Sequence, residues 1–351
     1  MKGLRKYIAP FAPDQSGAAA VFCELNGMIV ILDAGGCAGN ICGFDEPRWF
    51  ESRSAIFSAG LRDMDAILGR DDRLVEKIGK ACEKIKAEFI AVIGTPVPAV
   101  IGTDYRALSR MIEKKTGIVA LTMDTSGTRL YDEGEKKAWK ALFHCFSREK
   151  KQISEGRIGL IGATPLEFGG YMEEEYFKEY FEKKGYKNPV CYGMGAGISH
   201  MREASFAEKN IVLAPSGLEA ARYLKKEFGT PYELFCPPEV IPDWKQHVSR
   251  LEELSGKKVL VVHQQAVANS IRQEILASCR AQVRVASWFM LDREWKEEGD
   301  LCLKEEDDWI DLVNREDYDV IIADPLLKRA VPNYVGIWWD LPHFAVSGKK
   351  R

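Results

Sequence analysis

Short apolar runs alternate with longer amphipathic stretches along the whole chain of 351 residues. Continuous apolar runs of strand length, separated by helical stretches of about 10–15 residues, indicate parallel sheets covered by helices on both faces. The stretch Leu218–Phe228 is a clear helical example, because it follows Pro215-Ser216-Gly217 and ends at Gly229. We therefore predict an α/β fold. The runs expected to be strands are Met28–Ala34, Phe89–Gly94, Ile118–Met123, Ile158–Gly162, Val190–Tyr192, Ile211–Ala214, Tyr232–Cys236, Val259–His263, Val283–Phe289, Val320–Ala323 and Val335–Trp338.

Charged segments divide this pattern into three parts. The segments Arg148–Lys151 and Glu252–Lys258 each precede a new apolar strand. Each new part then continues with a small or polar turn and a helix, which is the order of a Rossmann-like unit. We predict three Rossmann-like domains with parallel sheets, at residues 1–152, 153–254 and 255–351.

The composition excludes several classes of protein. Hydrophobic residues at 46% and charged residues at 29% are ordinary values for a globular protein. The net charge of −3 gives no basic surplus for binding nucleic acid. The longest apolar runs, such as Met28–Leu32, fall far short of the ~20 residues of a membrane helix. Met1–Tyr7 shows no apolar segment of a secretory signal. We expect a cytoplasmic protein with no nucleic-acid or membrane partner, and we expect the acidic stretch Trp295–Asp308 to be a solvated insertion.

The loop after the first predicted strand carries the most distinctive chemistry. Residues 33–43 contain four glycines and two cysteines. Glycines allow a backbone to approach a bulky cofactor closely, and cysteine thiolates are the ligands of iron–sulfur clusters. Gly35, Gly36, Cys37 and Cys42 are therefore candidate cofactor-binding residues, with the two cysteines as metal ligands. Two thiolates are too few for a four-iron cluster, so other ligands would come from elsewhere or from a second copy of the chain.

Polar residues that follow predicted strands are the other candidates. Ligands of open α/β sheets bind beyond the carboxyl ends of the strands. By this rule Asp33, Asp124, His200 and His263 are candidates to line a cleft, where a carboxylate or an imidazole can supply protons. We expect His343 to belong to the core or to an interface. The chain has no Gly-x4-Gly-Lys-Ser/Thr pattern, so it does not hydrolyse ATP by a P-loop.

The order of these features resembles the nitrogenase component 1 family. The stretch Ser16–Cys37 is similar to the family's opening helix, strand and cluster turn, with Cys37 at the cluster cysteine. Residues Asp65–Asp104 and Ala207–Tyr232 are similar to two later segments of the family. The resemblance implies three Rossmann-like domains and an oxidoreductase component. It also implies that a P-loop iron–sulfur reductase docks transiently and passes single electrons to a cluster, and that a substrate is reduced between the three domains.

The departures from the family pattern are equally informative. The resemblance places two other cluster cysteines near Pro13 and at Pro96, and a glutamate at Ala99. No cysteine stands near Leu213-Ala214, where nitrogenase anchors its active-site cofactor. The chain is therefore not expected to be a nitrogen-fixing subunit, and its short length is closer to the tetrapyrrole-reducing relatives.

Three hypotheses for the thiols stay open. In a twofold homodimer, Cys37 and Cys42 of both chains would hold one [4Fe-4S] cluster at the interface. In a heterodimer with a related subunit, Cys37 would give one ligand to a cluster held mainly by the partner. In the third hypothesis no cluster exists. The leading function is a nitrogenase-like reductase component. The alternatives are a non-catalytic scaffold or carrier for a metal cluster or a tetrapyrrole, and a plain Rossmann-type binding protein without metal.

Overall fold

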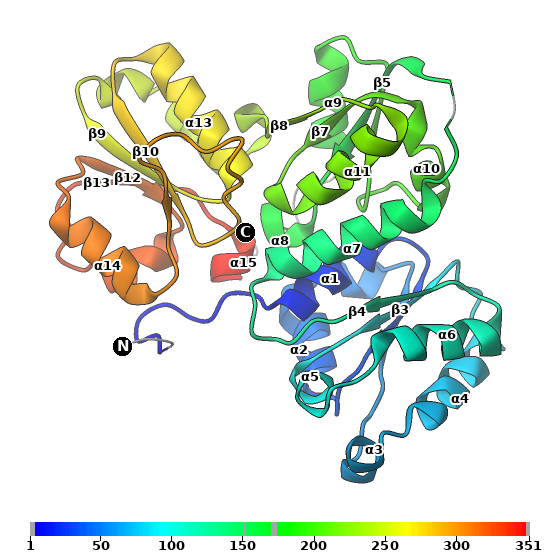
Figure 1. Cartoon of the computed structure of the whole chain (residues 1–351). Helices are drawn as coiled ribbons and strands as arrows, with labels where there is room; N and C mark the ends of the chain where they lie inside the picture. The colour runs from blue at the N-terminus through cyan, green and yellow to red at the C-terminus, as the bar shows by residue number, and fades with distance from the viewer. Residues whose placement is uncertain (1–3, 151, 170–173, 349–351) are drawn as a thin grey trace.

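The computed structural model of the chain describes residues 4–150, 152–169 and 174–348. Within these residues, all strands belong to three separate parallel sheets, each flanked by helices (Figure 1). The predicted α/β fold with three parallel sheets is confirmed. None of the described helices is long and apolar enough to cross a lipid bilayer.

The first sheet has the strand order β2-β1-β3-β4. Every residue of β1 and β3 is buried, as expected for central parallel strands covered on both faces. The strands are β1 (Met28–Ile31), β2 (Ala55–Ser58), β3 (Ile90–Ile93) and β4 (Ala120–Met123). The helical segments are α1 (Asp14–Phe22), α2 (Gly36–Asn40), the π-helical turn η1 (Ile41–Asp45), η2 (Trp49–Glu51), α3 (Asp63–Leu68), α4 (Asp71–Cys82), α5 (Pro96–Ile101) and α6 (Tyr105–Thr116).

The second sheet has the strand order β6-β5-β7-β8. Its strands are β5 (Ser154–Ile161), β6 (Asn188–Cys191), β7 (Ala207–Val212) and β8 (Tyr232–Leu234). The helical segments are α8 (Pro165–Phe168), α9 (Glu174–Lys183), α10 (Ile198–Arg202), η3 (Ala204–Phe206), η4 (Pro215–Gly217), α11 (Leu218–Phe228), η5 (Pro238–Val240), α12 (Pro242–Val248) and η6 (Leu251–Leu254). Helix α11 has the bounds predicted from the sequence, because Gly229 closes it in the left-handed conformation at φ 82°.

The third sheet has the strand order β11-β10-β9-β12-β13. Its strands are β9 (Lys258–Val262), β10 (Gln282–Ser287), β11 (Leu301–Cys302), β12 (Val320–Ala323) and β13 (Ile337–Asp340). The helical segments are α13 (Gln265–Ser278), α14 (Glu306–Arg315), η7 (Pro325–Ala330) and α15 (Phe344–Ser347). The acidic stretch 295–308 is not simply a solvated insertion, because β11 joins the sheet and buried Asp300 pairs with Arg272 at 2.7 Å.

Helix α7 (Tyr131–Phe146) joins the first two sheets and runs between them (Figure 1). It crosses α1 at close range, because Gly17 of α1 lies against the Tyr131 carbonyl and Gly134 of α7 lies against the Asp14 carbonyl. A side chain at either glycine would collide with backbone. This crossing fixes the amino-terminal end of α7 at the point where all three sheets meet.

Residues 4–13 form a strap from the third sheet's helices to α1, seen as the dark blue segment in Figure 1. The backbone N–H groups of Lys6, Tyr7 and Ile8 donate to the Glu306 carboxylate, each at 2.8 Å. Further along the strap, the Ala12 N–H donates to the Ala345 carbonyl at 3.2 Å. The strap therefore ties the carboxyl-terminal part of the chain to the start of α1.

Candidate functional site

The thiol loop, residues 35–45, follows β1 and is held at both ends by carboxylates. At its start, Asp33 is buried and accepts hydrogen bonds from the Ala38 N–H at 2.8 Å and the Ser58 hydroxyl at 2.6 Å. At its end, Asp45 accepts from the Ser16 hydroxyl at 2.6 Å and the Asn40 amide at 2.7 Å. The loop is thereby fixed to β2 on one side and to α1 on the other.

Both cysteines of the thiol loop are half-buried. Burial raises the pKa of Cys37, and the Asp33 charge raises it further, while the Thr95 hydroxyl opposes the shift. Burial also raises the pKa of Cys42, with added contributions from Glu46 and Asp33. Both sulfurs therefore carry protons at neutral pH in the free chain, and a metal that binds them releases those protons.

The surroundings of these thiols fit one half of a cluster site. A Cβ atom added at any of the loop's four glycines would meet no other atom within 4 Å, so the surface beside the sulfurs is open. In the described part of the chain, no three Cys, His, Asp or Glu side chains are grouped closely enough to hold a metal ion. One chain therefore offers two thiols at an open surface, whereas a four-iron cluster needs four thiolates.

Proline stands beside the thiols at one of the positions where the family resemblance implies cysteine. The Cys37 thiol contacts the Thr95 hydroxyl, and Pro96 follows directly at the start of α5. Gly127 lies against both Gln15 of α1 and Pro96 of α5. The start of α1, next to Pro13, and the start of α5 thus converge near the loop, but neither supplies a sulfur.

An exposed apolar face lies at the carboxyl edge of the first sheet, beside the thiol loop. Helices α3 and α5, which follow β2 and β3, contact each other there. The side chains exposed on this face are Phe44 of η1, Met64, Ile67 and Leu68 of α3, and Val97, Val100 and Ile101 of α5. A contiguous apolar surface beside a half-complete ligand set is typical of a subunit interface.

A second group of polar residues, the junction cluster, lies buried where the three sheets meet. Tyr131 and Glu135 come from α7, Glu167 from α8, His263 follows β9, and His343 follows β13. The Tyr131 hydroxyl and His343 Nε2 are 3.0 Å apart, and His343 Nε2 lies 3.6 Å from Glu167 Oε2. The imidazole rings of His263 and His343 stack with their centres 4.3 Å apart.

Burial shifts the protonation of the junction cluster toward neutral forms. It raises the pKa of Glu135 to about 8, against hydrogen bonds from Thr164 and Ser216 that oppose the shift. Burial and the charge of Glu135 raise the pKa of Glu167 well above its usual range. Burial lowers the pKa of His263 to about 4, and burial together with His263 lowers the pKa of His343 strongly. The cluster is therefore an uncharged hydrogen-bonding group near neutral pH.

The four predicted cleft residues lie in different places. Asp33 anchors the thiol loop, and His263 belongs to the junction cluster. Asp124 is exposed and pairs with Lys137 at 2.7 Å. His200 lies exposed on α10.

The acids of the junction cluster escaped the sequence analysis. Glu135 stands four residues after Tyr131 on the buried face of α7, and Glu167 is an acid between Leu166 and Phe168. An acid inside an otherwise apolar stretch such as 163–168 is the signal that could have found Glu167.

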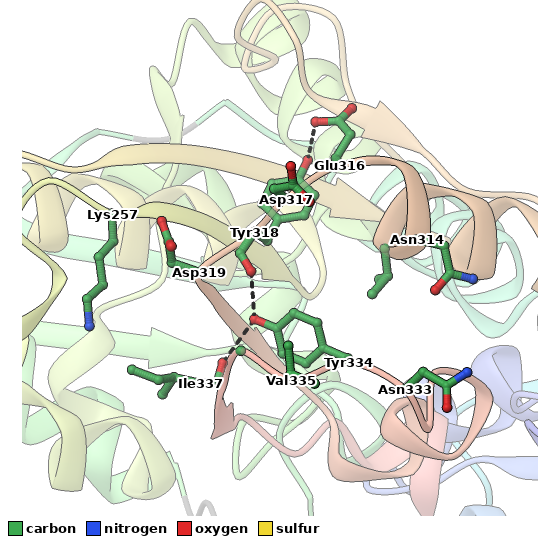
Figure 2. Close-up of a pocket in the computed structure, with 12 residues that line it drawn as sticks. Lys257, Asn314, Glu316, Asp317, Tyr318, Asp319, Asn333, Tyr334, Val335 and Ile337 are labelled. Carbon is green, nitrogen blue, oxygen red and sulfur yellow. Dashed lines mark hydrogen bonds between the residues drawn. The ribbon is translucent and has the colours of Figure 1, made fainter.

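A surface pocket of about 600 Å³ lies at the opposite edge of the third sheet. Figure 2 shows its lining, with the Tyr334 hydroxyl donating to the carbonyls of Tyr318 and Ile337 at 3.1 and 3.3 Å. Lys257 and Asp319 precede β9 and β12, so the pocket lies at the amino ends of these strands. Ligands of parallel sheets bind at the carboxyl ends, so this pocket is not the candidate site.

Comparisons of the sequence with known proteins point to one family. A family model described as nitrogenase component 1 type oxidoreductase matches residues 14–293. The chain is 26% identical over 178 residues to the nitrogenase iron-molybdenum cofactor biosynthesis protein NifE of Clostridium pasteurianum, covering 50% of this chain and 38% of that protein. It is 30% identical over 101 residues to one of the proteins that make up the light-independent protochlorophyllide reductase of Nostoc punctiforme, covering 27% of this chain and 20% of that protein. Both matches span less than half the length of the relative.

The fold is similar to solved structures of nitrogenase Cp1. The structure at pH 6.5 gives a TM-score of 0.71 at 13% identity, covering 97% of this chain and 87% of that chain. The structure at pH 5 gives a TM-score of 0.72 at 14% identity, covering 100% and 86%. At this identity the likeness concerns the fold alone.

Proposed function

The chain belongs to the nitrogenase component 1 type oxidoreductase family, and from that premise we propose that it is the substrate-binding component of a two-component reductase. In this proposal an ATP-dependent P-loop iron–sulfur reductase docks transiently and delivers single electrons. An iron–sulfur cluster at a subunit interface accepts them, and a substrate bound between the three domains is reduced.

The observation that carries the proposal is the pair of thiols beside the exposed apolar face. Cys37 and Cys42 are two ligands of a set that needs four, and they lie on the open side of the loop. A twofold axis through this face would bring two loops together and bury the apolar side chains of α3 and α5. We therefore propose a homodimer in which each chain supplies both cysteines to one [4Fe-4S] cluster.

The chain's own residues would prepare this site in defined ways. Asp33 holds the loop through the Ala38 N–H and the Ser58 hydroxyl, so the sulfurs keep their places before metal arrives. Gly35 and Gly36 leave room beside the sulfurs. The thiols give up their protons on ligation, and the apolar side chains of the partner face exclude water. When bound, the cluster supplies single-electron transfer.

The substrate is proposed to bind at the junction cluster. Thr164 and Ser216 follow β5 and β7, while His263, Asp324 and His343 follow β9, β12 and β13. The carboxyl ends of the second and third sheets therefore face each other there, which is where ligands of parallel sheets bind. Neutral acids and imidazoles at this place can donate hydrogen bonds and protons to a reduced substrate.

Two further parts of the account are proposals of the same kind. We propose that the three sheets mark domains at 1–152, 153–254 and 255–351. We also propose a cytoplasmic location, because all nine cysteines are free and free thiols are typical of reducing compartments.

A second candidate function is a non-catalytic scaffold or carrier for a metal cluster or a tetrapyrrole. Two observations favour it. Pro13 and Pro96 stand where the resemblance implies cluster cysteines. The relative with the longer match is a cofactor biosynthesis protein, although the match covers only 38% of it.

Anaerobic reconstitution with iron and sulfide tests the two functions against each other. We expect visible absorbance in the wild type, its loss in Cys37→Ala and Cys42→Ala, and its retention in Cys302→Ala, which removes an exposed thiol outside the loop. A P-loop iron–sulfur reductase with MgATP should then bleach the absorbance. Absorbance that no reductase bleaches, but that moves to an acceptor protein, would favour the carrier.

A further inference from the structure

The junction cluster contains buried polar atoms that make no hydrogen bond of normal geometry to the described residues. These atoms are Glu135 Oε2, both carboxylate oxygens of Glu167 and His343 Nδ1. Glu135 is 0% exposed, and Glu167 and His343 are 2% exposed. A buried polar atom without a partner costs about 1–3 kcal/mol, so such a group in a folded protein calls for a functional explanation.

Charge alone does not explain why two carboxyl groups lie together at this place. Among the described residues, the cation whose charge acts on Glu135 is Arg48, and Arg48 already pairs with Glu46 at 2.8 Å and Glu24 at 3.1 Å. His343 lies nearest to Glu167 but is neutral, since burial disfavours its charged form. Two unpaired buried carboxylates repel each other, so the pair is stable only with at least one proton bound.

The groups facing the pair come from every element that packs on it. On α7 these are Tyr131 and Asp132, and from the turn after β5 Thr164 donates to Glu135 at 2.5 Å. The thiol of Cys236, after β8, senses the charge of Glu167. From the third sheet come His263 and His343. No lysine is among these groups.

A route to solvent leads along α7. Asp132 lies one helical turn before Glu135, a spacing that places two side chains on the same face. Asp132 accepts hydrogen bonds from the Met290 N–H at 2.7 Å and from the Glu133 N–H at 3.0 Å. It also lines a hollow of about 350 Å³ together with Phe289 and Lys296.

We propose that Glu135 and Glu167 form a buried proton store, refilled from solvent through Asp132, that supplies protons to the substrate reduced at the junction. The proposal rests on the proposed function for the identity of the proton acceptor. It does not rest on it for the presence of the proton or for its route, both of which concern this chain alone.

Each step of the proton transfer balances. The O–H bond of the Glu135 carboxyl breaks, and its proton moves to the substrate atom that has gained an electron from the iron–sulfur reductase. The Glu135 carboxylate then takes a proton from Asp132, and Asp132 takes one from water in the hollow. Burial raises the pKa of Asp132 only to about 6, below the value of about 8 for Glu135, so refilling runs downhill.

Infrared spectroscopy of the whole chain tests for the stored proton. A protonated carboxyl group has a carbonyl stretch well separated from that of a carboxylate. We expect such a band near neutral pH, its loss at higher pH, and its reduction in Glu135→Gln and in Glu167→Gln. The control Glu133→Gln changes the surface acid that pairs with Lys136 and should leave the band unchanged. A wild-type spectrum without this band near neutral pH would overturn the proposal, whatever the variants do.

The route is tested by the rate at which the same band shifts in heavy water. We expect Asp132→Asn to slow the shift by about tenfold or more, because it removes a proton carrier. An unchanged rate would refute the role of Asp132. Both measurements need neither iron nor substrate, so they can succeed while the reductase function fails. The reverse result, a working reductase without the band, would reject only the proton store.

Discussion

A single carboxylate, that of Asp33, organises the start of the thiol loop. It is 2% exposed and bridges the loop to β2 through the Ala38 N–H and the Ser58 hydroxyl. Bonds from neutral donors to a buried carboxylate are among the stronger hydrogen bonds of a protein. The same charge disfavours the thiolate of Cys37.

Asp33→Ala should therefore have two measurable effects. The free energy of unfolding should fall by about 2–4 kcal/mol, because two buried hydrogen bonds lose their acceptor. The pKa of Cys37 should fall with the loss of the neighbouring charge, so alkylation of Cys37 should become faster at neutral pH. Mass spectrometry measures that rate, with Cys302 in the same sample as reference. Slower alkylation, or unchanged stability, would contradict this role of Asp33.

Gly35 and Gly36 form a matched pair for a second prediction. Gly35 has φ 122°, a conformation that side chains rarely adopt, whereas Gly36 begins α2, and neither glycine has an atom within 4 Å of an added Cβ. Gly35→Ala should lower the free energy of unfolding by about 1–3 kcal/mol through backbone strain. Gly36→Ala should leave it unchanged or raise it by about 0.5–1 kcal/mol. Chemical denaturation of both variants decides, and equal effects would show that the turn does not need Gly35.

At the residue scale, the sequence predicts the loop better than the junction. Cys37 and Cys42 stand in a glycine-rich loop after a strand, and this local pattern suffices to single them out. Glu135 lies in a helix with exposed acids such as Glu133, and an acid there usually faces water. Only the contacts of α7 with other elements show that it is buried.

At the scale of elements, the sequence predicts the central strands and misses the edges. The strands β1, β3, β9 and β12 are continuous apolar runs, which is the pattern of buried parallel strands. The edge strand β2 is half-exposed and only four residues long, and β11 has two residues. Edges this short carry no periodicity of their own, since their place in the sheet depends on the neighbouring strand.

The contact between α7 and α8 makes stability depend on pH in a defined way. The folded chain raises the pKa of Glu135 from 4.5 to about 8, so folding favours the protonated acid. Its contribution is fully present below about pH 4.5 and is lost as the pH rises through about 8. The two histidines act oppositely, because their lowered pKa values reduce stability as the pH falls below 6.5.

Glu135→Gln isolates the acid's share of this dependence. The variant cannot ionise, so its stability relative to the wild type should increase as the pH rises from about 4.5 to about 8. Thermal unfolding across this range measures the difference, and Glu133→Gln is the surface control on the same helix. A constant difference between variant and wild type would mean that Glu135 titrates normally.

At the scale of the whole molecule, the exposed apolar face is the feature that a single chain leaves unexplained. The sequence predicts that Cys37 and Cys42 need further ligands, but it does not show which surface would bring them. The structure places Val97, Val100 and Ile101 on the helix beside the loop, with Val100 86% exposed. A homodimer through this face would bury these side chains and complete the set of thiols.

A charge on this face should prevent dimer formation. Val100→Glu introduces a carboxylate that water solvates in the monomer and that a dimer would bury, so light scattering should show a shift toward the monomer. Val335→Glu is the control, because Val335 is 98% exposed on the third sheet's side of the chain. If Val100→Glu remains as dimeric as Val335→Glu, the dimer uses another surface.

The most direct test of the account is the iron and acid-labile sulfide content per chain, measured with the molar mass on protein purified without oxygen. The account predicts about two irons and two sulfides per chain, from one four-iron cluster shared by two chains. It also predicts twice the mass of the 39.5 kDa chain and loss of the iron in Cys37→Ala. An iron-free protein after reconstitution, or a cluster that persists in Cys37→Ala, would contradict the shared site.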